Sequence, residues 1–106
     1  MHRARADADV FRAIADPTRR KILDRLRRGP VAVNALAEGF EQSRPAVSKH
    51  LRVLRGAGLV AEERSGRERV YRIQPKPLRA VVGWIEGYRT MWEVNLGNLK
   101  RYLEKP

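Results

Sequence analysis

The sequence predicts a mainly helical domain with one two-stranded β-hairpin, its elements in the order α-α-α-α-β-β-α. Apolar residues recur at helical spacing in five segments. Two β-favouring runs flank the turn residues Ser65-Gly66-Arg67-Glu68, a pattern typical of a hairpin. The chain has 106 residues and no cysteine, which fits one compact domain and excludes disulfides and thiolate metal ligands. We therefore treat residues 1–106 as a single domain.

Helical periodicity and helix-breaking residues predict the element boundaries. The expected helices are about Asp7–Ala15, Pro17–Arg28, Val33–Gly39, Arg44–Gly56 and Leu78–Lys105. The expected strands are Leu59–Glu63 and Arg69–Ile73. Residues 1–6 are expected to form a loose N-terminus. Asp16 suits the cap of the second helix, and Pro17 suits its first position because proline has no N–H to leave unpaired.

The third and fourth predicted helices are separated by only a short turn, Glu41-Gln42-Ser43. Ser43 is a good N-cap for the fourth helix, and Pro45 fits its first turn. Two helices joined in this way are typical of a helix-turn-helix. The hairpin that follows makes the expected fold a winged helix-turn-helix.

The charge balance indicates a polyanionic partner. The net charge is +11, from 23 Lys and Arg against 12 Asp and Glu, and a folded domain this basic usually meets nucleic acid. No apolar stretch follows the first residues, and no apolar run approaches the ~20 residues that span a bilayer. We expect a cytoplasmic protein without membrane contact.

The fourth helix has one apolar and one basic face. Val47, Leu51 and Leu54 recur at i, i+4 and i+7 and are expected to be buried. No carboxylate occurs between Glu41 and Glu62, as a phosphate-facing surface requires. The residues predicted to contact double-stranded DNA here are Ser43, Arg44, Pro45, Ser48, Lys49, His50 and Arg52. Arg and Lys can donate to guanine in the major groove, whereas the major groove of A-form RNA is too narrow for a helix.

The hairpin is a second candidate contact. Basic residues lie in or beside its turn, where a wing can rest on the DNA backbone or enter the minor groove. These residues are Arg64, Arg67, Arg69 and Arg72. Nearby glutamates dilute their charge, and we assign the contact to Arg67 and Arg69.

The last helix, residues 78–105, carries a heptad-like apolar seam that so small a domain cannot cover alone. We predict that it forms a homodimer. The residues predicted to form the interface are Phe11, Val81, Ile85, Tyr88, Trp92 and Leu99. An alternative is that Trp84, Tyr88, Met91 and Trp92 line a pocket for a small-molecule effector; we favour the dimer core.

No pattern in the sequence suggests catalysis or a metal. Neither a carboxylate pair, a His-centred cluster nor a Gly-rich phosphate loop has the required spacing. The two histidines are His2 and His50, too few for a zinc site without cysteine. We expect no enzyme activity, no metal and no cofactor.

Three stretches together resemble the ArsR/SmtB family of winged-helix repressors. They are residues 11–20 (FRAIADPTRR), 43–51 (SRPAVSKHL) and 57–60 (AGLV). The resemblance implies a homodimer built from the first and last helices, which binds an inverted repeat in a promoter and represses by blocking polymerase. Many members release DNA on binding a metal through Cys on the third helix or Asp and His on the last. This chain has none of these residues there, so we predict a non-metal-sensing, autorepressor-like branch.

Overall fold

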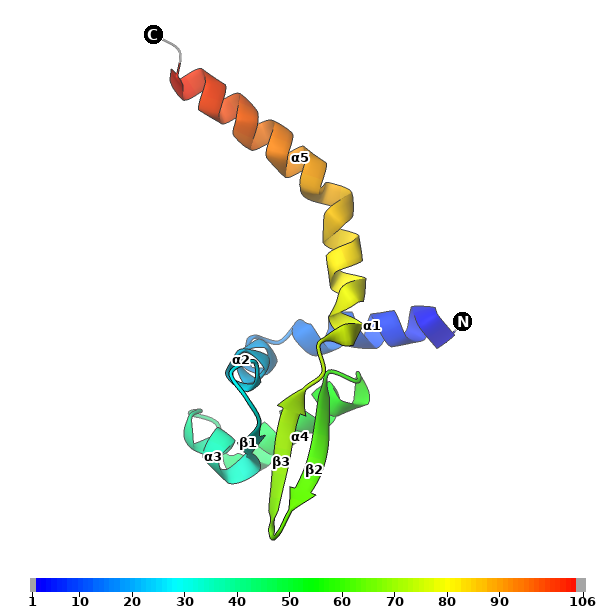
Figure 1. Cartoon of the computed structure of the whole chain (residues 1–106), viewed down its shortest axis with the longest axis vertical. Coiled ribbons are helices and arrows are strands. Elements are labelled where there is room, and N and C mark those ends of the chain that lie inside the picture. The colour runs from blue at the N-terminus through cyan, green and yellow to red at the C-terminus, as the bar shows by residue number, and fades with distance from the viewer. Residues whose placement is uncertain (1, 105–106) are drawn as a thin grey trace.

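The computed structural model describes residues 2–104, with side chains from residue 4 onward. It confirms a mainly helical winged fold (Figure 1). The helices are α1 (His2–Ile14), α2 (Pro17–Leu26), α3 (Val33–Glu38), α4 (Arg44–Gly56) and α5 (Arg79–Glu104). The strands are β1 (Val31–Ala32), β2 (Val60–Ser65) and β3 (Glu68–Ile73), and a 3-10 turn, η1 (Lys76–Leu78), precedes α5.

The junction of α1 and α2 is held by side chains of α2. The Asp16 carboxylate caps α2 by accepting from the Arg19 backbone N–H at 3.0 Å. Arg19 Nε donates to the Ala13 carbonyl at 2.6 Å, and Arg20 Nη1 donates to the Ile14 carbonyl at 2.8 Å. These bonds satisfy carbonyls that the end of α1 leaves without helical partners.

The core lies between the helices and the small sheet. Ile22, Leu26 and Leu36 are fully buried there. As the sequence predicts, Val47, Leu51 and Leu54 of α4 are each 0 % exposed. Each of these side chains contributes about 1.5–3 kcal/mol by leaving water. This burial determines which face of α4 points outward.

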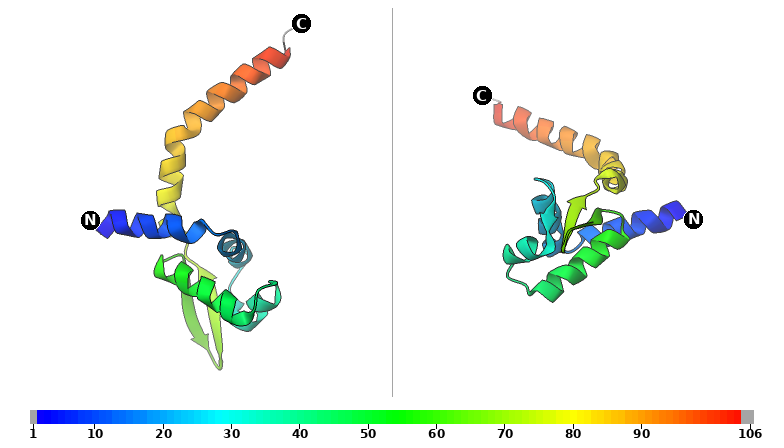
Figure 2. Two further views of the ribbon diagram at one scale, coloured as in Figure 1. Left: turned by 180° about the vertical axis from the view of Figure 1, so that it is seen from behind. Right: turned by 60° about the horizontal axis from the view of Figure 1, so that its bottom comes forward.

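The sheet has three antiparallel strands in the order β1-β3-β2. β1 was not predicted, because two residues are too few to show a period-two pattern. The hairpin turn is shorter than predicted, since the strands extend to Ser65 and Glu68. Gly66 has φ +61° in this turn, a region that favours glycine. Figure 2 shows α4 lying across the strands, with the hairpin tip extending beyond it.

Both terminal helices differ from prediction. Helix α1 begins at His2, so residues 2–6, predicted to be loose, are helical because their Ala and Arg residues favour a helix. Met1 and Lys105, which lie in the predicted N-terminus and last helix, are outside the described residues. Helix α5 begins one residue later than predicted, because Leu78 belongs to η1, where its backbone N–H donates to the Pro75 carbonyl at 2.9 Å.

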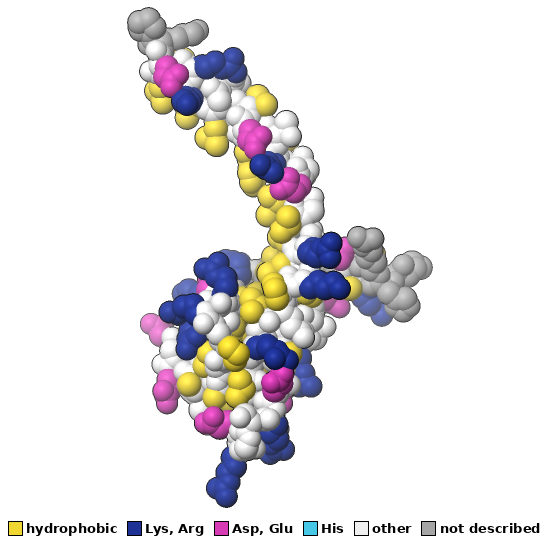
Figure 3. Space-filling view, viewed as in Figure 1, with side chains coloured by type: hydrophobic (Ala, Val, Ile, Leu, Met, Phe, Trp, Pro, Cys, Tyr) yellow, Lys and Arg dark blue, Asp and Glu magenta, His cyan; other side chains and the backbone are white. Residues whose placement is uncertain are grey.

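Helix α5 packs against α1 and η1 at its start and then projects from the body (Figures 1 and 2). None of its residues is buried. An apolar stripe follows the helix in the space-filling view (Figure 3). Within residues 2–104, no helix is long and apolar enough to cross a membrane.

Candidate nucleic-acid interface

Helix α4 presents the basic face that the sequence predicts. The Ser43 Oγ accepts from the Ala46 backbone N–H at 3.3 Å and so starts the helix. Opposite the buried stripe, Pro45, Lys49 and Arg52 are exposed. The backbone N–H groups of the first turn of α4 have no partners within the helix. They lie at its N-terminal end, beside Ser43, where a helix attracts phosphate.

One flank of α4 faces the hairpin across a groove of about 180 Å³. Arg44, Ser48 and Arg52 line it from the helix, and Arg69 lines it from β3. A second hollow, which shares Arg44 and Arg69, adds Arg67. The fold therefore brings five of the predicted DNA-contacting residues together from two separate segments.

The register of the hairpin decides which arginines share this side. Arg64 pairs with Arg69, and Glu62 pairs with Tyr71, so these four side chains lie on one face of the sheet. Arg72 lies on the opposite face and forms an ion pair with Glu63. The register supports choosing Arg69 rather than Arg72, and it adds Arg64 as a candidate.

The groove contains one carboxylate, Glu62, whose role sequence reasoning missed. Its Oε2 accepts from Tyr71 Oη at 2.8 Å and from Arg55 Nη1 at 3.1 Å. Its Oε1 lies 3.7 Å from Arg69 Nε. Burial, together with the bond to the Glu62 carboxylate, raises the pKa of Tyr71 above 10.0. Glu62 thus joins a cation of α4 to a cation of the wing.

Arg55 was also missed, although its position could have been recognised. It follows Ser48 by seven residues and Arg44 by eleven, so the three share a flank of the helix. Arg55 lines the groove together with them.

His50, another member of the predicted DNA-contacting set, lies beside the junction of α1 and α2. Its Nδ1 lies 3.9 Å from Asp16 Oδ2 and 3.4 Å from Arg19 Nη1, and the side chain is 23 % exposed. This contact places it on the flank of α4 that faces the α1–α2 junction. Its contact with DNA stays a prediction, whereas its contacts with Asp16 and Arg19 were not predicted, because polarity does not show which flank of a helix packs against a neighbour.

The predicted dimer residues divide into two groups. Val81 packs in part against the chain's own core, and Ile85 is half-buried. Phe11 meets Trp84 edge-to-face at a ring-centroid distance of 5.9 Å. From Tyr88 onward the apolar seam of α5 is exposed. Tyr88, Trp92 and Leu99 are 45 %, 54 % and 53 % exposed in the single chain.

A metal site is not formed by the described residues, since no three His, Cys, Asp or Glu side chains among them could hold an ion.

A capped basic helix after a short turn, with an arginine-bearing hairpin beside it, defines a winged helix-turn-helix protein. A family model described as a helix-turn-helix domain matches residues 14–63.

Two relatives with known names cover about three quarters of the chain. The HTH-type transcriptional regulator Rv2034 of Mycobacterium tuberculosis is 46 % identical over 81 residues, 76 % of this chain and 76 % of that protein. The transcriptional repressor SdpR of Bacillus subtilis is 39 % identical over 77 residues, 73 % of this chain and 86 % of that protein.

Similar solved structures support the same classification. An ArsR-like transcriptional regulator from Rhodococcus sp. RHA1 is 32 % identical, with a TM-score of 0.72 and coverage of 100 % of both chains. The homodimeric winged helix-turn-helix DNA-binding domain of a possible ArsR-family regulator from Mycobacterium bovis is 31 % identical, with a TM-score of 0.68, over 82 % of this chain and 83 % of that one. The chain belongs to the ArsR/SmtB family of winged helix-turn-helix transcriptional regulators, and it is a DNA-binding regulator of transcription.

Proposed function

We propose that this chain acts as a homodimeric repressor that reads an inverted-repeat operator, with α4 of each subunit in a major groove. The proposal rests on one observation: basic side chains of α4 and of the β2–β3 hairpin lie on the same side of the domain. Arg44, Lys49 and Arg67 form no ion pair within the described residues, so their charges are available to DNA.

The two elements would divide the recognition between them. Arg44 and Lys49 on α4 reach base edges, where a bidentate Arg–guanine pair supplies about 1–3 kcal/mol of discrimination. Ser43, Ser48 and the first N–H groups of α4 hold phosphates, which fixes the register without reading sequence. At the wing tip, Arg67 contacts the backbone or the minor groove.

The apolar stripe of α5 supports a dimer. Large apolar side chains that stay half-exposed along a helix mark an interaction surface, and the Mycobacterium bovis domain is homodimeric. We assign residues 78–105 to dimerisation, together with Phe11 of α1. The alternative effector pocket is less well supported, because Trp84, Met91 and Trp92 are each more than half exposed along the helix.

The assignment of repression rather than activation rests on membership of the family and on the similarity to the SdpR repressor. The absence of cysteine from the chain, and of His and Asp from α5, supports regulation without a metal. The proposal assigns the chain no catalysed reaction and places it in the cytoplasm, where promoter DNA lies.

Selection of duplexes from a random library tests the proposal. The protein should enrich an inverted repeat whose half-sites lie about 34–36 Å apart, or a multiple of that distance, and binding should weaken steeply with salt. Transcription from a promoter that carries the selected site should fall when the protein is added. Enrichment of a single half-site would contradict the dimer, and increased transcription would contradict repression.

A further inference from the structure

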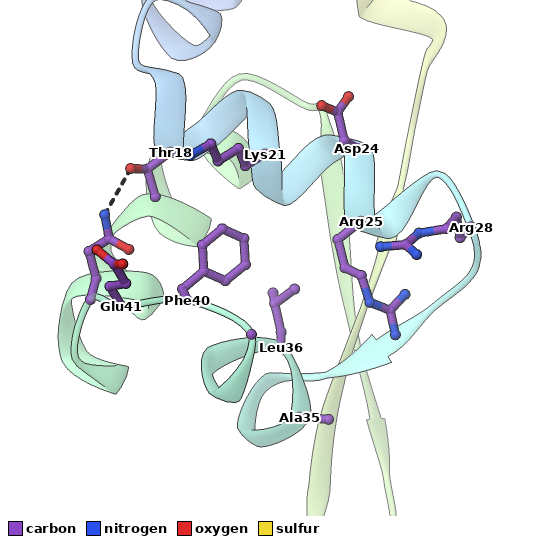
Figure 4. Close-up of a pocket in the computed structure, with 11 residues that line it drawn as sticks. Thr18, Lys21, Asp24, Arg25, Arg28, Ala35, Leu36, Phe40 and Glu41 are labelled. Atoms are coloured by element: carbon purple, nitrogen blue, oxygen red, sulfur yellow. Dashed lines mark hydrogen bonds between the residues drawn. The ribbon is translucent and has the colours of Figure 1, made fainter.

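A large cavity lies away from the wing. It has a volume of about 610 Å³ and separates α2 from α3 and the turn that follows α3 (Figure 4). Cavities of about 300–1,000 Å³ commonly hold small molecules. The proposed DNA-contacting set uses none of its lining residues.

One wall of this cavity is basic. Lys21 and Arg25 lie one turn apart on α2, and Arg28 lies in the turn that follows the helix. Within residues 4–104 none of the three forms an ion pair. Lys21 and Arg25 are like charges at i and i+4 on one helix and repel each other, so a bound anion would relieve the repulsion.

The lining of the cavity also includes two carboxylates, Asp24 and Glu41. The Asp24 carboxylate points away from the cavity floor, whereas the Arg25 side chain points toward α3 (Figure 4). Glu41 lies across the cavity on the turn. Neither carboxylate lies within ion-pair distance of a cation in the described part of the chain.

The floor of the cavity is apolar. Phe40 extends into the space between the two helices, beside Leu36 (Figure 4). Leu36 belongs to the buried core, and Phe40 packs against that core while it remains half-buried. A basic wall above an aromatic floor suits an organic anion with an apolar body, such as an aromatic or medium-chain carboxylate.

The cavity is connected to the start of α4. Phe40, Glu41 and Gln42 lead directly into Ser43, the cap of that helix. Gln42 Nε2 donates to Thr18 Oγ1 of α2 at 3.0 Å, which ties the turn to the basic wall. A molecule that contacts both α2 and Phe40 would therefore bias the position of the turn and of the helix after it.

We propose that this cavity binds a small organic anion with an apolar body and that binding changes the DNA affinity of the protein. The first part stands on the cavity alone. The second rests on the proposed function, and by linkage the anion and the DNA must alter each other's affinity by the same factor.

Anilinonaphthalene sulfonate is a suitable probe, because it is an organic anion with an aromatic body. Phenylnaphthylamine has the same aromatic body without the charge and is the neutral control. Titration followed by amide NMR should move signals in residues 18–28 and 35–42. The charged probe should bind more tightly than the neutral one. Arg25→Gln should weaken its binding about tenfold, as expected for the loss of one charged contact. Arg27→Gln, which removes an exposed cation of the same segment outside the cavity, should not.

Three results would overturn the binding site. They are shifts confined to α5, no shifts at millimolar probe, and equal losses in Arg25→Gln and Arg27→Gln. The link to DNA is measured separately on the selected duplex, with and without probe, and an unchanged affinity would overturn it. If Arg25→Gln weakened duplex binding without any probe while Arg27→Gln did not, the basic wall would be a DNA-backbone contact and not an anion site.

Discussion

Arg44→Ala tests the base-reading role assigned to the start of α4. Arg44 is exposed, lies within the first turn of the helix and shares a hollow with Arg67 and Arg69. A cation near a helix N-terminus opposes the helix dipole, so its removal should leave folding stability unchanged or raise it slightly. The effect should therefore appear entirely in DNA binding.

The expected loss on the selected duplex is about 1–3 kcal/mol, the value of a bidentate Arg–guanine contact. This corresponds to a Kd about 5- to 150-fold higher. On a scrambled duplex the loss should be much smaller, because only the electrostatic share remains. Fluorescence anisotropy with labelled duplexes at fixed salt measures both.

Arg72→Ala is the matched control, because it removes the same charge from the far face of the hairpin, where Arg72 pairs with Glu63. It should change both affinities little. Equal losses on the selected and scrambled duplexes would show that Arg44 touches only phosphate. No loss on either would remove this flank of α4 from the interface.

Four further changes test other parts of the account. Arg67→Ala should lower the slope of log Kd against log salt by about one unit; an unchanged slope would place the wing tip off the DNA. The hydrogen bond from the Arg19 backbone N–H lowers the pKa of Asp16 below 3.8. The ionised Asp16 carboxylate therefore stabilises the fold above pH 3.8, and this stabilisation is lost as the pH falls through the pKa of Asp16 in the folded protein. Urea denaturation from about pH 6 to 2 should show this loss in the wild type and not in Asp16→Asn, and parallel curves would contradict it. Glu62→Gln should lower the pKa of Tyr71 toward 10.0, because Gln accepts the same bond without negative charge; phenolate absorbance measures this, and an unchanged value would assign the shift to burial alone. Trp92→Asp should yield monomers in sedimentation, whereas a surviving dimer would move the interface off α5.

The sequence predicted α4 to the residue, from Arg44 to Gly56. Its boundaries depend on local chemistry, the Ser43 cap and a glycine end, and its buried stripe repeats at helical spacing. Strand β1 has no such signal, since its two residues become a strand only by pairing with Val70 and Tyr71 far along the chain.

The same distinction applies to the site. Polarity identified Arg44 and Arg67 as candidates, whereas the Glu62 link between Arg55 and Arg69 depends on the packing of α4 against the hairpin. The contacts of His50 with Asp16 and Arg19 were missed for the related reason that only the fold brings these residues beside it. Contacts between segments require the three-dimensional arrangement.

Amide NMR of the protein mixed with its selected duplex most directly tests the claim that α4 and the wing together read DNA. The account predicts that the largest changes lie in residues 43–52 and 64–69. Changes centred on α5 or on α2, with those two segments unaffected, would contradict it.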